Sequence, residues 1–453
     1  MKKKIQQAVL LFLTATVFNL SCQKEKINSS VNENESAEQI SSSLQGQGHL
    51  KQTKTFPSDV VRSWINMQLL MLKLPVPAGS PGSDRAQAYS GITLYEAVMP
   101  GMPAYQTLTG QLTAFPEMPG TEPGKAYHWA ASANAALAQI SRKLFSTTAA
   151  ANQTTINNLE ATLLASYANE ADAATLHRSV AFGKEVAGRV AKWADSDGWK
   201  NVNPPYVPPV GFGIWVLTNP AAPAANPYAY QRRLIVPGST NGSTPAPLPP
   251  FSSDPSSAFY AMVKEVYDAR NAITPEQKAM ADYFKDNPGY GPGGGFVWIF
   301  QEALRIAHPM LDQAAVAYAK VGLAQNDASI ALFTDKYKFL TMRPVTYIRA
   351  YINPTWSTYI PTPNHPEFPS GHATTNGAVL EMMRNVFGDH FPMTLRVYDF
   401  YPSRAYETFT QMGLEMADSR FYSGLHYKET CVKSIAQGKK VAQNILNKIH
   451  FKK

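Results

Sequence analysis

Residues 367–374 read Glu-Phe-Pro-Ser-Gly-His-Ala-Thr, and this stretch is the most informative in the chain. Ser370 precedes a run in which apolar residues recur at helical spacing, which predicts that a long helix begins here. The start of a helix offers free backbone N–H groups at the positive end of its dipole, and both favour a bound anion. Ser370 and Gly371 are therefore expected to bind an anion, with His372 in the first turn. The alternative is a capping Ser beside a half-exposed His, but a chance Pro-Ser-Gly-His has odds of roughly one in several hundred at average residue usage.

Two clusters of charged residues lie on either side of this stretch. Lys336 and Arg343 are seven residues apart, which predicts that they share one helix face, and Pro344 follows where such a helix would end. Arg420 and His426 are six residues apart and flank Gly424, which permits a turn. Alone, the first pair is more typical of solvated surface charges, and the second is as readily structural.

From Pro57 onward the apolar residues recur every three to four positions, and runs with period two are scarce. This pattern predicts an all-α fold built from helical bundles, with almost no sheet. After a first helix near residue 57, the expected helices cover residues 84–99, 126–146, 153–167, 172–195, 257–271, 275–286, 296–324, 327–341, 370–387, 405–418 and 429–449. The longest irregular stretch, 199–256, could join two bundles, and loops of this length usually carry function or cover a site.

Composition excludes several classes of protein. The 453 residues are 44% hydrophobic and only 16% charged, which supports a substantial core and argues against disorder of the whole chain. The net charge of +8 is mild and scattered, and no basic run is interleaved with aromatic residues, so nucleic-acid binding is not expected. With only Cys22 and Cys431, a disulfide scaffold is excluded.

The N-terminus has the features of an export signal. Three lysines at residues 2–4 precede an apolar run at residues 8–20, which is shorter than the ~20 residues of a membrane-spanning helix. Ser21-Cys22 followed by polar residues resembles a bacterial lipobox, although Asn19 stands where an aliphatic residue is usual. Cys22 is therefore the predicted lipidation site, with an ordinary cleavage site as the alternative. We expect an exported protein that is periplasmic or anchored to the outer membrane by its lipid alone.

In chain order the clusters read Lys-x6-Arg-Pro, Pro-Ser-Gly-His and Ser-Arg-x5-His. They resemble the motifs of the vanadium-dependent haloperoxidase and type 2 phosphatidic acid phosphatase superfamily, especially its bacterial haloperoxidase-like members. The motifs cover residues 336–426, and the likeness extends upstream to 84–98, 178–199 and 254–284. The resemblance implies that the oxyanion site lies in a C-terminal bundle. The expected organisation is a signal peptide (1–21), a disordered tether (22–55), an N-terminal helical region (56–255) and a catalytic domain (256–453).

The resemblance also implies a role for each motif residue. The cofactor would be vanadate, and phosphate could occupy the same site. His426 would bind vanadium in a peroxidase or attack phosphorus in a phosphatase, and His372 would transfer protons. Lys336 would polarise hydrogen peroxide, and a halide would then attack it to give hypohalous acid. The residues that would hold the oxyanion are Lys336, Arg343, Ser370, Gly371, His372, Arg420 and His426.

Three positions near the motifs bear on the choice of activity. The family usually has Asp four residues after its last His, but Thr430 stands there with Glu429 beside it, which leaves the orientation of His426 in doubt. Haloperoxidases often carry Trp three residues before the motif Lys, whereas Phe333 keeps an aromatic wall without the indole N–H. His365 resembles a second His of the bromoperoxidases, where chloroperoxidases tend to have Phe; the alternative is a loop His before Pro366. His365 and Phe333 are thus assigned to a halide pocket.

Three functions follow, and they differ in class. The flanking sequence favours a haloperoxidase that uses hydrogen peroxide to oxidise bromide or iodide, and the sequence specifies no organic acceptor. The runner-up is an acid phosphatase that hydrolyses phosphate monoesters through a phosphohistidine. The third is a tethered, non-catalytic binding lipoprotein, which fits the signal and tether equally well but gives no reason for the three ordered motifs.

Overall fold

The computed structural model describes residues 51–72, 82–285, 294–396 and 401–453. The predicted signal peptide, Cys22 and most of the predicted tether lie outside the described residues and stay predictions. Residues Gly48–Lys453 form one compact unit. Within the described ranges, no helix combines the length and the apolar character that a membrane crossing requires.

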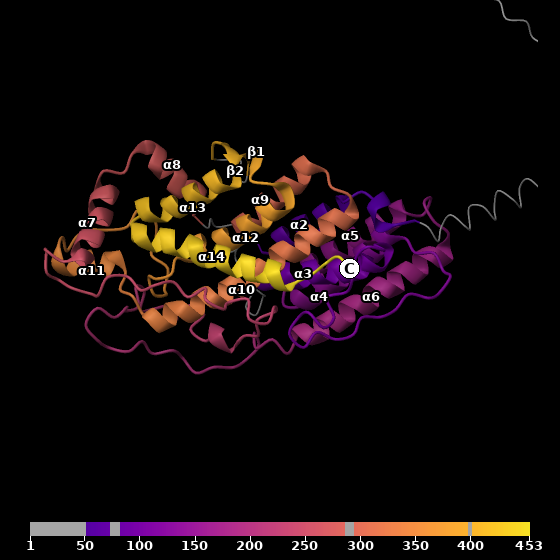
Figure 1. The fold of residues 1–453 in the computed structure, drawn as a ribbon, viewed down its shortest axis with the longest axis horizontal. Helices are drawn as coiled ribbons and strands as arrows, with labels where there is room; N and C mark the ends of the chain where they lie inside the picture. The colour runs from indigo at the N-terminus through magenta and orange to yellow at the C-terminus, as the bar shows by residue number, and fades with distance from the viewer. Residues whose placement is uncertain (1–50, 73–81, 286–293, 397–400) are drawn as a thin grey trace, which may run out of the picture. The chain divides into compact units, whose positions relative to one another are not determined.

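The unit is helical, as predicted, with one antiparallel pair of short strands in its described part (Figure 1). The helices are α2 (Asp59–Met71), α3 (Ser83–Val98), α4 (Trp129–Leu144), α5 (Ala150–Ser166), α6 (Ala173–Ala194), α7 (Ala258–Asn271), α8 (Pro275–Tyr283), α9 (Gly294–Ala307), α10 (Leu311–Phe339), α11 (Pro344–Tyr351), α12 (Gly371–Phe387), α13 (Phe409–Tyr422) and α14 (Lys428–Lys448). The strands are β1 (His390–Leu395) and β2 (Arg404–Thr408). Three 3-10 turns are η1 (Thr53–Thr55), η2 (Met99–Gly101) and η3 (Ala229–Gln231).

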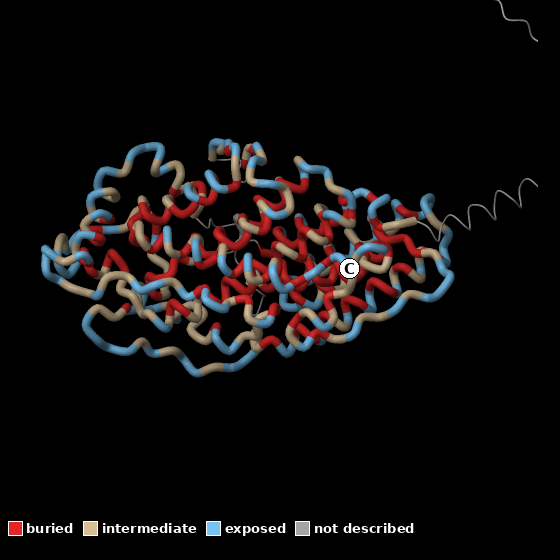
Figure 2. Tube along the Cα trace, in the orientation of Figure 1, coloured by how far each residue is buried: buried red, intermediate tan, exposed pale blue. Residues whose placement is uncertain are grey.

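One hydrophobic core runs through both regions predicted on either side of residue 255. It includes buried residues of α2, α3, α4 and α6 together with residues of α10, α12 and α14. Figure 2 shows the buried residues in the middle of the unit and the exposed ones along its outer loops. A smaller core joins α7, α11 and α13, including Phe259, Tyr347 and Trp356. Both cores stabilise the helix ends that carry the motif residues.

The pairing of α12 with α14 matters most for the site, because His372 and His426 lie at their N-terminal ends. Gly438 of α14 faces the carbonyl group of Thr374 so closely that a Cβ atom there would clash with it. Gly377 of α12 meets the carbonyl group of Ile435 in the same way. The two glycines let the backbones of the two helices approach closely, which fixes α12 against α14.

The predicted helix boundaries were wrong in three places. The break expected near residue 325 lies at residues 308–310, where His308 has a positive φ of 45° and Pro309 follows. Asn326 and Asp327 are instead buried inside α10, and the Asp327 carboxylate accepts the N–H groups of Ile235 at 2.9 Å and Val236 at 3.0 Å. The expected helix at 405–418 begins only at Phe409, after β2. Helix α11 was not predicted.

The long irregular stretch 199–256 runs along one edge of the unit (Figure 1). It borders the loop before Ser370, since Thr218 N donates to the Asn364 side-chain oxygen at 3.0 Å and Ala225 N to the Asn364 carbonyl at 2.9 Å. The folded part also begins earlier than the predicted end of the tether. Thr53 is buried, and its hydroxyl donates to the Val98 carbonyl at 2.7 Å.

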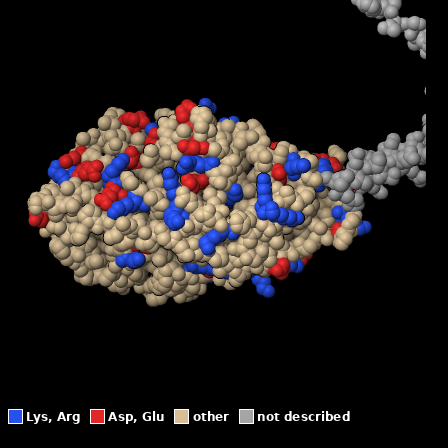
Figure 3. Space-filling view, in the orientation of Figure 1, with Lys and Arg blue, Asp and Glu red and all other residues tan. Residues whose placement is uncertain are grey.

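Surface charge does not mark the site. On the face shown in Figure 3, Lys and Arg side chains are interspersed with Asp and Glu side chains, so this face has no large field of one sign. The motif cations are buried instead: Lys336 and Arg343 have no exposed surface, and Arg420 is 4% exposed. Burying a charge is costly unless a partner compensates it, so three buried cations indicate a site rather than solvated charges.

Candidate functional site

The three sequence clusters converge at one place in the structure. Lys336 lies in the last turn of α10, Arg420 in the last turn of α13, and His426 in the turn before α14. Arg343 and Ser370 are the N-cap residues of α11 and α12. Burial, followed by the charges of Arg343, Lys336 and Arg420, holds the pKa of His426 well below its usual value. All three cations therefore act on the same imidazole.

The predicted arrangement of Lys336 and Arg343 on one helix face was wrong. Helix α10 ends at Phe339, and Leu340 follows in a left-handed conformation with φ 49°. Arg343 lies in extended backbone beyond this turn, and Pro344 begins α11 rather than ending the first helix. The two cations thus reach the site from a helix end and from a separate loop.

Lys336 is held by backbone carbonyl groups of the loop before α12. Its ammonium group donates to the carbonyls of Pro366 at 2.7 Å and Glu367 at 3.0 Å. Burial and the neighbouring charge of Arg343 lower its pKa well below the ordinary value. An anion near this ammonium group would stabilise its charged form.

Arg343 is fixed by three sets of contacts. Its Nε donates to the His365 carbonyl and one terminal nitrogen to the Leu425 carbonyl, each at 3.0 Å. The other terminal nitrogen lies 3.0 Å from His365 Nδ1. Burial lowers the pKa of this guanidinium group to about 10, so it stays charged at neutral pH. Arg420 donates to the Phe284 carbonyl at 3.1 Å.

The N-terminus of α12 supplies the predicted anion-binding end. Ser370 adopts the extended backbone of an N-cap, and its N–H donates to the Ser434 hydroxyl at 2.8 Å. The space beside Gly371 is open, because a Cβ atom there would have no heavy atom within 4 Å. His372 follows in the first turn, with its ring centroid 6.4 Å from that of Phe296. The Lys336 ammonium group donates to the carbonyls of Pro366 and Glu367 in the same loop, a few residues before this helix start.

The predicted halide-pocket residues also lie together. The rings of Phe333 and His365 meet edge to face, with their centroids 5.6 Å apart. Burial and the charges of Lys336 and Arg343 hold the pKa of His365 well below its usual value, and His372 contributes to the same shift. His365 is therefore neutral at physiological pH, and it lies near Lys336, Arg343 and His372.

One residue of the site was missed by sequence reasoning. The Glu367 carboxylate lies 2.8 Å from His426 Nδ1, and it also accepts the Thr430 hydroxyl at 3.0 Å and the Tyr427 N–H at 3.1 Å. It is completely buried, and burial raises its pKa to about 7. Its position next to the Pro-Ser-Gly-His motif could have suggested that Glu367 is part of the site. No local sequence pattern, however, pairs it with a His that lies 59 residues later.

The donor set fits a tetrahedral oxyanion. Lys336, Arg343 and Arg420 provide buried positive charge, and Glu367 is the carboxylate that contacts their cluster. Positive charge is therefore in excess in a part of the protein where it must be compensated. A bound dianion would compensate this charge, and the start of α12 favours an anion as well. Phosphate and vanadate both have the required charge and shape.

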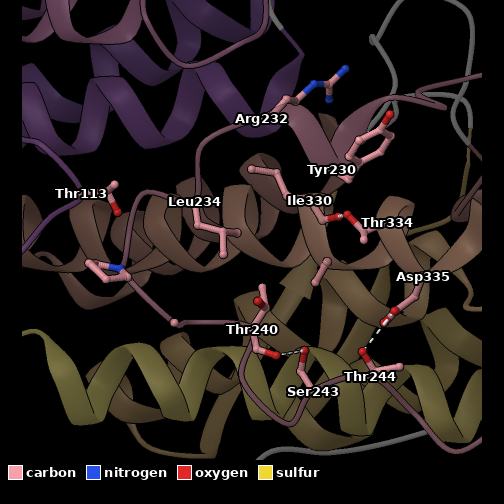
Figure 4. Close-up of a pocket in the computed structure, with 13 residues that line it drawn as sticks. Thr113, Tyr230, Arg232, Leu234, Thr240, Ser243, Thr244, Ile330, Thr334 and Asp335 are labelled. Carbon is pink, nitrogen blue, oxygen red and sulfur yellow. Dashed lines mark hydrogen bonds between the residues drawn. The ribbon is translucent and has the colours of Figure 1, made fainter. Parts of the chain in front are cut away.

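A cavity of about 500 Å³ lies between α10 and residues 230–244, and none of the motif residues lines it (Figure 4). Asp335, beside Lys336 in the chain, accepts the Thr244 hydroxyl at 3.1 Å here. Its other oxygen accepts the Gln437 side-chain amide at 2.7 Å, and Gln437 in turn accepts the Thr374 hydroxyl at 3.0 Å. This buried chain ties α10, α14 and α12 together behind the site.

Comparison with known proteins agrees with this geometry. Residues 316–452 match the family model described as the VCPO second helical-bundle domain, which includes all three motif clusters. No curated protein matches the chain in sequence. The chain is similar to the first bacterial vanadium-dependent iodoperoxidase structure, with 27% identity and a TM-score of 0.79 over 88% of this chain and 97% of that one.

Two further structures share the fold at lower identity. The holo-type and apo-type structures of a bacterial vanadium-dependent chloroperoxidase are each 16% identical to this chain, with TM-scores of 0.64 and 0.63. Each comparison covers 86% of this chain and 97% of the other. The helical arrangement is therefore shared across nearly the full length of these structures.

Proposed function

The chain belongs to the vanadium haloperoxidase and type 2 phosphatidic acid phosphatase superfamily, and on this premise we propose that it is a vanadate-dependent haloperoxidase. It would use hydrogen peroxide to oxidise bromide or iodide to hypohalous acid. The observation that carries the proposal is the buried cage of Lys336, Arg343 and Arg420 around His426. The match to an iodoperoxidase structure over 88% of the chain supports the peroxidase rather than the phosphatase assignment.

The residues that would hold vanadate are those of the cage. The two arginines and Lys336 neutralise its charge, and the Ser370 hydroxyl and the Gly371 N–H add hydrogen bonds at the start of α12. Lys336, Arg343, Ser370 and Arg420 are buried, so they act in a medium of low polarity, where each interaction is stronger than in water. When bound, vanadate supplies Lewis-acid activation of hydrogen peroxide without a change in oxidation state.

The histidines have separate tasks. His426 would bind the cofactor through Nε2, because its other ring nitrogen contacts the Glu367 carboxylate. His372 lies in the first turn of α12, where it can take a proton from hydrogen peroxide and return it to the leaving oxygen. The Lys336 ammonium group would supply positive charge beside the bound cofactor and so stabilise negative charge that develops there.

The test of the proposal is a side-by-side assay of the vanadate-free and vanadate-loaded protein. We expect loaded protein to oxidise bromide and iodide in the presence of hydrogen peroxide, and vanadate-free protein to do so only at background rate. Hydrolysis of a phosphate monoester by vanadate-free protein, without halide oxidation by the loaded form, would favour the phosphatase. Absence of both activities in folded protein would favour the binding lipoprotein.

We expect the holoenzyme to oxidise chloride at least about tenfold more slowly than bromide or iodide, a difference of about 1.4 kcal/mol in activation free energy. Chloride is the hardest of the three halides to oxidise and needs the most activated peroxide. His365 places a neutral, hydrogen-bonding ring against Phe333 beside the cage, where the chloroperoxidases tend to have an apolar ring. Initial rates with the three halides at equal concentration measure this preference.

The variant His365→Phe tests whether His365 contributes to the preference. The change removes the partner of one Arg343 nitrogen and makes the pocket apolar, so the ratio of the bromide rate to the chloride rate should change. His177→Ala is the matched control, because His177 lies on the exposed face of α6. An unchanged ratio in His365→Phe would remove His365 from the argument, and efficient chloride oxidation by the wild type would overturn the prediction.

A further inference from the structure

We propose that Glu367 is the positioning residue of His426, in place of the aspartate that relatives usually carry four residues after that histidine. The inference rests on the proposed function only in so far as His426 is the residue that bonds to the central atom. Glu367 lies outside the three sequence motifs, because it precedes Pro369 and Ser370 in the loop before α12.

The contacts of the imidazole determine which nitrogen carries the proton. A terminal nitrogen of Arg343 lies 3.4 Å from His426 Nε2, and a guanidinium group can only donate. Nε2 is therefore the unprotonated nitrogen, and Nδ1–H donates to the Glu367 carboxylate at 2.8 Å. This tautomer directs the Nε2 lone pair into the cage, which is the state that a ligand or a nucleophile requires.

The carboxylate is itself held from every side. Besides Nδ1 of His426, the Tyr427 N–H and the Thr430 hydroxyl donate to it. All three partners are donors, which favours the ionised carboxylate as their acceptor. The backbone of Glu367 is fixed as well, because its N–H donates to the Thr341 carbonyl at 3.0 Å and its own carbonyl accepts from Lys336. A carboxylate anchored in this way restricts both the tautomer and the ring plane of His426.

The identity of residue 430 fits this assignment. Thr430 occupies the position of the usual aspartate, in the first turn of α14, but its hydroxyl donates to Glu367 instead of accepting from His426. The neighbouring Glu429 does not take the role, because its carboxylate is 41% exposed and pairs with Lys433 at 2.7 Å. The carboxylate that contacts His426 therefore comes from the loop before α12, and the Thr430 hydroxyl of α14 donates to it.

The loop before α12 links several residues of the site to one another. Residues 365–367 contact three members of the cage at once: Arg343 through the His365 carbonyl, Lys336 through two carbonyls, and His426 through the Glu367 carboxylate. Ser370 follows three residues later as the N-cap of α12. One short segment therefore sets the positions of cations, axial histidine and helix start together.

The experiment compares Glu367→Gln with wild type in two measurements that need no turnover. The first is the ¹⁵N spectrum of the histidine-labelled, vanadate-free protein, with His426→Ala identifying the His426 signals. The second is the dissociation constant for vanadate and for inorganic phosphate. We expect wild type to show the Nδ1–H tautomer, and Glu367→Gln to show a mixture and to bind both anions about 10- to 100-fold more weakly, the usual effect of losing an outer partner of a metal ligand.

The most stringent control transfers the carboxylate from residue 367 to residue 430. Glu367→Ala should bind vanadate weakly, and the double variant Glu367→Ala/Thr430→Asp should recover affinity and the Nδ1–H tautomer, because it restores a carboxylate at the usual position. A structural role for Glu367 would not predict this rescue. Glu429→Gln should match wild type in both measurements.

The outcomes separate this inference from the proposed function. An unchanged tautomer and unchanged anion affinity in Glu367→Gln, or no recovery in the double variant, would overturn the assignment of Glu367. A wild type that lacks halide oxidation while Glu367→Gln still loses the tautomer would overturn the proposed function and leave the assignment intact. If Glu367→Gln does not fold, Glu367→Asp serves in the same two measurements, with a smaller loss expected.

Discussion

The variant His426→Ala is expected to lose both halide oxidation and any phosphate-ester hydrolysis, with turnover falling at least about a thousandfold, an effect of about 4 kcal/mol on the activation barrier. His426 is the proposed direct bond from the protein to the central atom, and its Nδ1 is already engaged by Glu367, which leaves Nε2 for that bond. Its removal leaves the cations to hold the anion by charge alone. Steady-state rates of loaded protein at saturating peroxide and halide measure the loss.

The same variant has a structural effect that must be separated from the chemical one. His426 is 4% exposed, and its loss deprives the Glu367 carboxylate of one donor. Circular dichroism and thermal unfolding therefore accompany the assay, and His177→Ala on the exposed face of α6 is the control that should keep wild-type rates. Near-normal turnover in folded His426→Ala would refute the assignment of the site.

The motif residues could be predicted because each motif is a short stretch with a recognisable residue type and spacing, and the motifs follow one another in a fixed order. The N-cap Ser370, the glycine after it and the cations are recognisable from residue type and spacing. In the structure Ser370 caps α12, and the charges of the three cations act on the His426 imidazole. Helical periodicity likewise predicts most of the helices, since each buries one face against the shared core. These features depend on neighbours within a few residues.

The predictions that failed depend on distant contacts. A helix was expected to continue from Lys336 to Arg343, but the backbone groups between them pair with other segments. Trp215 N donates to the Leu340 carbonyl at 2.8 Å, and Glu367 N donates to the Thr341 carbonyl at 3.0 Å. These hydrogen bonds replace the helical ones, and the sequence of residues 336–343 does not predict them. The role of Glu367 was missed for the same reason, because its partner lies 59 residues away.

A second large effect is expected for Arg343→Ala, which should weaken the binding of vanadate and phosphate about a hundredfold or more. The loss of one fixed donor to a developing or bound oxyanion typically costs about 2.7–4 kcal/mol in a buried site. Arg343 is such a donor, since its guanidinium group is anchored by the His365 and Leu425 carbonyls and lies 3.4 Å from His426 Nε2. Titration of the vanadate-free protein with each anion measures the change.

A second substitution separates weaker anion binding from a loss of stability in Arg343→Ala. Arg343→Ala also leaves two buried carbonyl groups without their donor, and each can lower the free energy of unfolding by about 1–3 kcal/mol, so binding must be measured well below the melting temperature. Arg343→Lys keeps the charge but not the planar set of donors, and it should bind with intermediate affinity. Arg189→Ala removes an exposed arginine that pairs with Glu185 on α6 and should change neither anion's affinity. If Arg343→Ala binds vanadate within about threefold of wild type, less than about 0.7 kcal/mol, Arg343 is not part of the cage.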